Sequence, residues 1–137
     1  MSAFVRQGAG LVILLLAAAL APAAIPSAAG DVKNGEAIYS RCAACHALAY
    51  DRTGPHHCGL FGRKAGTLKG FQYSDAMKHS GIVWTPPALD EFLANPFKAV
   101  PGTSMGYAGV TDAKERSDLI AYLQEANKSA ECSKGLR

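Results

Sequence analysis

The pentapeptide Cys42-Ala43-Ala44-Cys45-His46 decides most of what this chain can become. Cys-x-x-Cys-His is the attachment signature of c-type haem. Its two thiols can add across the two vinyl groups of one haem, and the adjoining imidazole then becomes the proximal ligand of the iron. The motif therefore predicts one covalent haem c, held by Cys42 and Cys45, with His46 bound to the metal.

The first thirty residues differ from the rest of the chain. Arg6 is the only charged side chain before Asp31, and an unbroken apolar run covers residues 11–20. Prolines and small residues follow this run. A basic start, an apolar centre and a small-residue cleavage site are typical of a secretory signal peptide. We predict a signal peptide over residues 1–29 and export to the periplasm. An uncleaved anchor is the alternative, because the uncharged stretch is long enough to span a bilayer.

The remaining residues, 30–137, are predicted to form one small domain. Without Arg6 it has 13 basic and 11 acidic side chains. This balance is too weakly basic to indicate binding of nucleic acid. We expect a monomer, and on the oxidising side of a membrane we expect spare cysteines to tend to pair.

Helix signals are short and scattered, and the sequence shows neither a strand ladder nor a repeat. Four helices are predicted from capping residues, proline and glycine stops and apolar spacing, at residues 31–39, 74–79, 85–95 and 111–126. Residues 47–71 and 100–109 carry the glycines and prolines of loops. The pattern predicts an all-α domain whose long loops wrap around something large.

Further blocks around the pentapeptide resemble class I c-type cytochromes, in the branch of mitochondrial cytochrome c and bacterial cytochrome c2. The matching blocks are Gly30-Asp31-Val32 with Gly35, Cys42 to His46, Thr53-Gly54-Pro55, Gly59 to Lys64, Tyr73 to Ala76, Gly81 to Trp84, Asn95-Pro96, Pro101 to Met105, and Asp118 to Leu123. The resemblance implies the cytochrome c fold, in which the N- and C-terminal helices cross beside one haem.

By this resemblance Met105 is the distal ligand of the iron. A thioether is a soft, neutral donor, and His/Met ligation raises the potential of a haem. With His46 and Met105 both bound, the iron keeps no open position for dioxygen, peroxide or substrate. Core packing is the alternative role for a methionine.

The resemblance also assigns residues around the haem. The carbonyl group of Pro55 would accept the Nδ1 proton of His46, which fixes the imidazole and makes it a stronger donor. Arg63, Tyr73 and Trp84 would hydrogen-bond the buried propionates, where an unpaired carboxylate is costly. Without the resemblance these three would be interpreted as a surface arginine and core aromatics.

Three features depart from the family pattern. Phe92 stands where a tyrosine usually reaches the methionine sulfur, and Met77 replaces a common asparagine in the haem crevice and is interpreted as packing. His57 falls where the family has an apolar residue against the haem, so either its ring packs flat or the loop shifts. A zinc site over residues 56–58 is conceivable, but adjacent residues converge poorly on one metal.

Cys58 and Cys132 are left over after haem attachment. Because the family topology places the loop of Cys58 near the end of the last helix, the resemblance suggests a disulfide between Cys58 and Cys132. Two unpaired thiols are the alternative.

The resemblance implies a soluble one-electron carrier and no enzyme. Its partners would be a quinol-oxidising, bc1-type cytochrome complex as donor and a terminal oxidase or photosynthetic reaction centre as acceptor. Lys64 and Lys98 would support transient electrostatic docking. The alternative is a haem peroxidase or gas sensor with a labile Met105. Thiol–disulfide exchange would need a βαβ setting that the sequence does not show.

Overall fold

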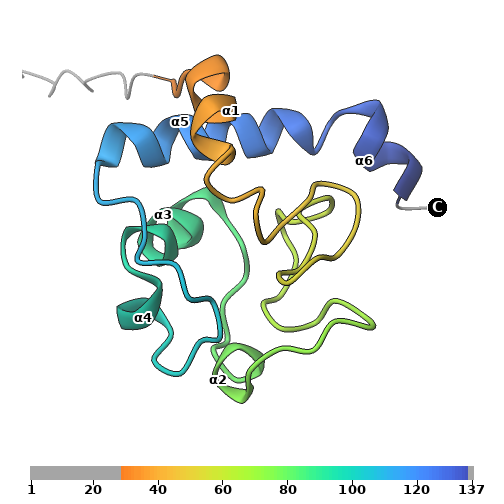
Figure 1. Cartoon of the computed structure of the whole chain (residues 1–137), viewed down its shortest axis with the longest axis vertical. Helices are drawn as coiled ribbons and strands as arrows, with labels where there is room; N and C mark the ends of the chain where they lie inside the picture. Colours follow the sequence, from red (N-terminus) through yellow and green to blue (C-terminus); the bar gives the residue numbers. More distant parts are fainter. Residues whose placement is uncertain (1–28, 136–137) are drawn as a thin grey trace, which may run out of the picture.

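Six helices joined by long loops make up residues 29–135, the part of the chain that the structure, a computed structural model, describes (Figure 1). The helices are α1 Val32–Tyr39, α2 Asp75–Lys78, α3 Pro86–Ala94, α4 Pro96–Ala99, α5 Ala113–Ala126 and α6 Ala130–Gly135. An isolated antiparallel bridge between Lys64 and Val83 is the sole strand-like pairing in these residues. The predicted all-α class is confirmed.

Most of the predicted signal peptide, residues 1–28, lies outside the described residues. Among residues 29–135, none of the helices has the length and apolar character needed to cross a membrane.

Capping side chains begin the helices where the sequence predicted them. Each cap accepts a hydrogen bond from the backbone N–H three residues later, which satisfies a donor that the first helical turn leaves free. The caps of the four predicted helices are Asp31, Ser74, Thr85 and Asp112. Helices α4 and α6 were not predicted. Asn95 ends α3 and at the same time caps α4, whose first residue is Pro96.

Helix α1 crosses α5 at close range (Figure 1). A Cβ atom at Gly35 would overlap the backbone carbonyl oxygen of Asp118 and lie 2.7 Å from Cβ of Tyr122. Only glycine permits this approach. The carboxylate of Asp118 is fully buried and accepts from the backbone N–H of Asp31, the Asn34 amide and the Lys114 ammonium group, at 2.5–2.7 Å. The predicted crossing is confirmed, and hydrogen bonds to the buried Asp118 carboxylate tie its two helices together.

The core lies below this crossing and takes buried side chains from α1, α3, α5 and the loops. Helix α3 packs against α5, and α4 packs against α3. The loop before α2 and the loop before α5 lie below the crossing in the view of Figure 1. These loops and helices together surround the site described next.

Candidate cofactor site

A cavity of about 300 Å³ opens in the middle of the domain and is lined by helices and loops from nearly the whole described chain. Its walls are mostly apolar. All eight residues singled out from the sequence line it, namely Cys42, Cys45, His46, Pro55, Arg63, Tyr73, Trp84 and Met105. The fold therefore brings residues from position 42 to position 105 to one place.

The pentapeptide forms a hydrogen-bonded helical turn shortly after the end of α1. The backbone N–H of Cys45 donates to the Cys42 carbonyl oxygen at 3.0 Å, and that of His46 donates to the same oxygen at 2.9 Å. Residues three and four positions apart on a helical turn project to one side. Both thiols and the imidazole consequently face the cavity together, and neither Cys42 nor Cys45 is in a disulfide.

The His46 ring is fixed in one tautomer. Its Nδ1 lies 2.7 Å from the carbonyl oxygen of Pro55. Since a carbonyl oxygen can only accept, Nδ1 carries the proton and Nε2 keeps a lone pair for a metal. Burial lowers the pKa of His46, and the bond to Pro55 opposes this shift. The imidazole is thus neutral, and the lone pair of Nε2 is available to a metal.

Gly54 makes room for the same ring. A Cβ atom at this position would overlap Cε1 of His46 and lie 2.7 Å from both ring nitrogens. The backbone N–H of Gly54 also donates to the Cys45 carbonyl oxygen at 2.7 Å. A side chain on Gly54 is therefore excluded by the position of His46, a role that the sequence alone did not suggest.

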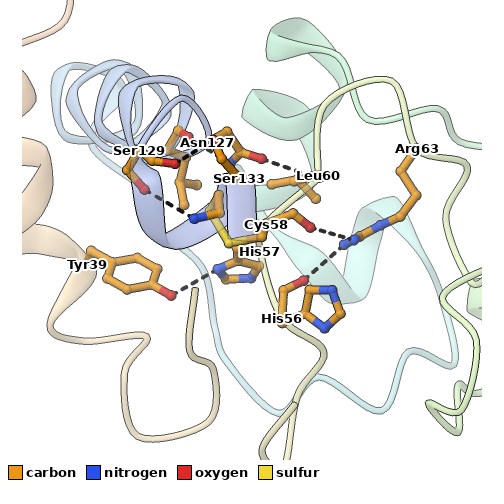
Figure 2. The surroundings of a disulfide bond; sticks show 11 residues. Tyr39, His56, His57, Cys58, Leu60, Arg63, Asn127, Ser129 and Ser133 are labelled. Atoms are coloured by element: carbon orange, nitrogen blue, oxygen red, sulfur yellow. Dashed lines mark hydrogen bonds between the residues drawn. A yellow bond between two sulfur atoms is a disulfide. The ribbon is translucent and has the colours of Figure 1, made fainter. Parts of the chain in front are cut away.

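The ring of His57 lies against the ring of His46. Its ring stacks on that of His46, with centroids 4.4 Å apart and planes inclined by 23°. Its Nδ1 lies 3.1 Å from the Tyr39 hydroxyl oxygen (Figure 2). Burial lowers the pKa of His57 to about 3, with nearby His46, Arg63 and His56 adding to the shift. His57 is therefore a neutral aromatic packing group at physiological pH.

Cys58 and Cys132 form a disulfide that joins the loop after the pentapeptide to α6 (Figure 2). Their Cα atoms lie 5.0 Å apart, and both residues are buried. The bond removes Cys58 as a metal ligand. His56 instead lies against Asp51, with Nδ1 2.7 Å from the carboxylate. Within residues 29–135 no three His, Cys, Asp or Glu side chains are grouped to hold a metal ion.

Arg63 and Trp84 are linked through the backbone. The N–H of Trp84 donates to the Arg63 carbonyl oxygen at 3.0 Å. The Arg63 guanidinium group donates to the carbonyl oxygens of His56 and Cys58 at 3.0 and 3.1 Å, which leaves further N–H groups available at the cavity (Figure 2). Among the described residues the indole N–H of Trp84 has no hydrogen-bond partner. Both side chains thus offer donors to an anionic group in an apolar setting.

The other end of the site has a different character. Met105 lies in the loop after α4 and packs against the core, with its backbone N–H bonded to the Thr103 hydroxyl oxygen at 3.2 Å. Met77 and Phe92 are buried and also line the cavity. The Phe92 ring meets Trp84 edge-on at 5.2 Å. The cavity therefore holds two thioethers, Met105 and Met77, and its apolar walls leave few competing donors.

This donor set fits a covalent haem. It combines two thiols on one helical turn, an imidazole with a free Nε2 lone pair, a thioether, and N–H donors placed for acidic substituents. No other common prosthetic group requires that combination.

Comparison with known proteins agrees with this fit. The family model described as "Cytochrome c" matches residues 32–127. The chain belongs to the cytochrome c family. It is 45% identical over 118 residues to cytochrome c2 of Blastochloris viridis, which covers 84% of this chain and 90% of that protein. It is 46% identical to cytochrome c of Gibberella zeae, over 74% of this chain and 99% of that one.

A solved structure extends the likeness to the fold. Cytochrome cH from Methylobacterium extorquens matches with a TM-score of 0.68 and 42% identity, covering 70% of this chain and 99% of the other. The cofactor of the chain is accordingly a covalently bound haem c, and members of its family are electron carriers and not enzymes. The expected family, fold class and cofactor are confirmed.

Sequence reasoning missed two contacts with His46, the close approach of Gly54 and the stacked ring of His57. The position of Gly54 directly before Pro55, whose carbonyl group was already expected to bond His46, could have indicated the first contact. The partnership of Tyr39 with His57 gave no sequence signal, because the two residues come from separate elements.

Proposed function

We propose that the chain is a one-electron carrier whose haem is attached through Cys42 and Cys45 and ligated by His46 and Met105. A bound haem supplies an iron that gains and loses one electron. The observation that carries the proposal is that both candidate ligands line one cavity, together with both attachment cysteines. The residues do the rest: they hold the cofactor, orient its ligand and exclude water.

Each assigned residue has a task that its surroundings support. Pro55 accepts the Nδ1 proton of His46 and thereby raises the donor strength of Nε2. Arg63, Tyr73 and Trp84 are proposed to hydrogen-bond the haem propionates. Burial lowers the pKa of Arg63, but a guanidinium group stays charged in proteins. Burial raises the pKa of Tyr73, so its hydroxyl group remains a neutral donor at neutral pH.

The proposed setting is the periplasm, reached through cleavage of the predicted signal peptide at residues 1–29. The proposed donor is a bc1-type quinol-oxidising complex, and the acceptor is a terminal oxidase or photosynthetic reaction centre. Exposed lysines such as Lys64 and Lys98 would steer the approach. With an isolated bc1-type complex, the rate of reduction should fall as salt rises. A rate indifferent to salt would contradict electrostatic docking.

Optical spectroscopy of the purified holoprotein tests the ligand set. The ferric form should show the weak near-infrared band of an Fe(III)–thioether bond, and the reduced form should not bind carbon monoxide. Met105→Leu should abolish the band and admit carbon monoxide. Met77→Leu is the matched control, because Met77 is the other thioether at the cavity, and it should keep both properties.

The results separate the candidate functions. Loss of the band in Met77→Leu and not in Met105→Leu would reassign the distal ligand. Binding of carbon monoxide by the wild-type protein would replace the carrier with a gas-binding or peroxidase-like haem protein.

A further inference from the structure

We propose that His57 is a positioning residue for the proximal ligand, and that its stacked imidazole sets the plane in which the His46 ring is held. The inference rests on the proposed ligation by His46. It assigns a role to a side chain that stands in van der Waals contact with the ligand and contributes no bond to a metal. The stack of the two rings, 4.4 Å between centroids and 23° between planes, is the observation that carries it.

The existing hydrogen bond cannot set this plane alone. Nδ1 of His46 is fixed by Pro55, and Nε2 is fixed by whatever it ligates. Together with the Cβ–Cγ bond these two points define the ring plane, but a single hydrogen bond resists tilting of the ring only weakly. A contact on the face of the ring resists this tilting directly, and His57 supplies one. Aromatic stacking is directional, whereas an aliphatic side chain fills the space without a preferred plane.

His57 can act as a reference because it is itself held firmly. Its Nδ1 is hydrogen-bonded to the Tyr39 hydroxyl group at 3.1 Å, and the two rings meet edge-on at 5.7 Å (Figure 2). Its backbone N–H lies 3.2 and 3.1 Å from the carbonyl oxygens of Ala47 and Leu48. Both the ring and the backbone of His57 are thus tied to neighbouring segments.

The next residue fastens the same segment to the end of the domain. The Cys58 N–H donates to the Leu48 carbonyl oxygen at 2.7 Å, and its side chain forms the disulfide with Cys132 in α6. His57 is therefore held in place by α1, through the hydrogen bond to Tyr39, and by α6, through the disulfide of Cys58. An unbraced loop residue at this site could not hold a ligand plane.

The plane of an axial imidazole governs how unpaired spin spreads over a ferric haem. This gives a readout that packing or stability alone does not move. The experiment compares ferric holoprotein of wild type, His57→Leu, His57→Phe and Tyr39→Phe by the paramagnetically shifted haem methyl resonances and by the EPR g values. Tyr122→Phe is the control, because its ring also packs on Tyr39, at 5.2 Å, and its hydroxyl has no hydrogen-bond partner in residues 29–135.

In His57→Leu we expect an altered order and spread of the methyl shifts and altered g values, while the Fe–thioether band persists. His57→Phe, which keeps a ring face, should lie closer to wild type. Tyr39→Phe, which loses only the anchoring hydroxyl group, should shift the resonances in the same direction as His57→Leu but by less. Tyr122→Phe should leave them unchanged.

Wild-type methyl shifts in His57→Leu would overturn the inference, as would equal shifts in Tyr39→Phe and Tyr122→Phe. If His57→Leu does not yield folded holoprotein, the comparison of Tyr39→Phe with Tyr122→Phe decides alone. Failure of the proposed function is seen separately, since the wild-type protein itself would then lack the spectrum of a His/Met-ligated haem.

Discussion

The loop that carries His46 (residues 42–63, the proximal loop) is fastened to the rest of the domain at many points, whereas the loop that carries Met105 (residues 100–109, the distal loop) is held mainly by its own turns. In the proximal loop, Pro55, His57 and Gly54 all contact His46, and a disulfide anchors Cys58 to α6. These contacts reach back to α1, through His57 and Tyr39, and forward to α6, which is far away in the sequence.

The hydrogen bonds made within residues 100–109 are local. The N–H of Thr103 donates to the Val100 carbonyl oxygen at 3.0 Å, and the N–H of Met105 donates to the Thr103 hydroxyl oxygen at 3.2 Å. A bond from the Val110 N–H to the Leu93 carbonyl oxygen, at 2.8 Å, closes the loop at its end. Segments with few long-range ties open at lower free energy than braced ones. If His46 and Met105 are the iron ligands proposed above, the difference predicts that ligand exchange begins at Met105 while His46 stays bound.

The largest effect expected from this contrast comes from the disulfide. Cys58 and Cys132 are 74 residues apart, and closing a loop of that size stabilises a protein by about 4 kcal/mol in the chain-entropy model. The double variant Cys58→Ala/Cys132→Ala should lose about that much free energy of unfolding in a guanidinium titration of the holoprotein. Ser133→Ala, an exposed change on the same helix, is the control and should remain within about 0.5 kcal/mol of wild type.

If the double variant were as stable as wild type, the disulfide would not stabilise the proximal loop, and the contrast between the two loops would be wrong.

Gly54→Ala tests the proximal loop at its tightest point. The added methyl group would overlap Cε1 of His46, so the ring must move and its bond to Pro55 must lengthen. Overpacking of this kind costs about 3 kcal/mol. We expect that loss in denaturant titrations, together with a changed ferric spectrum. Lys69→Ala, an exposed change outside the cavity lining, should change neither. If Gly54→Ala were as stable as wild type, the proximal loop would be able to accommodate the added methyl group without loss of packing.

Local rules predicted much of the fold because the signals are themselves local. A cap such as Asp31 or Thr85 bonds a backbone group three residues away. Such a contact can be predicted from the sequence without knowledge of the tertiary structure. The family resemblance supplied the helix crossing at Gly35. Helices α4 and α6 were missed because helices this short depend on tertiary contacts, in α6 on the disulfide.

The site divides in the same way. Cys42, Cys45 and His46 lie within five residues of the sequence, so their motif predicts the cofactor. Met105 was assigned from the resemblance to the family. The stacking of His57 on His46 depends on how a loop folds back on the preceding turn, and its hydrogen bond to Tyr39 joins two separate elements. No spacing rule encodes such contacts, which is why the sequence left two outcomes open for His57.

A smaller effect is expected when the distal loop is challenged by alkali. Helix α4 ends at Ala99, directly before this loop, and carries the exposed Lys98. At high pH we expect the Lys98 amine to displace Met105, seen as loss of the Fe(III)–thioether band. Lys98→Ala should raise the midpoint of this transition by about one pH unit, or about 1.4 kcal/mol. Lys64→Ala should leave the midpoint unchanged. A midpoint unaffected by Lys98→Ala would mean that another group replaces the methionine.

Another effect appears only in acid and concerns the crossing of α1 and α5, after which the proximal loop starts. Hydrogen bonds from Lys114, then Asn34 and the Asp31 backbone, lower the pKa of Asp118 from 3.8 to about 2. A carboxyl group whose pKa is depressed on folding adds stability that is fully present above its unfolded pKa. That contribution must therefore disappear as the pH falls from about 4 towards 2.

Guanidinium titrations at several pH values between 7 and 2 check this prediction. Asp118→Asn removes the titrating group, so its deficit in stability relative to wild type should be constant above pH 4 and shrink below it. Glu125→Gln, which breaks an exposed pair with Lys128, is the control and should show no such pH dependence specific to the crossing. If the deficit of Asp118→Asn persisted undiminished at pH 2, the buried carboxylate would not be the group that makes the crossing sensitive to acid. Apolar packing would then be what holds the crossing of α1 and α5 together at low pH.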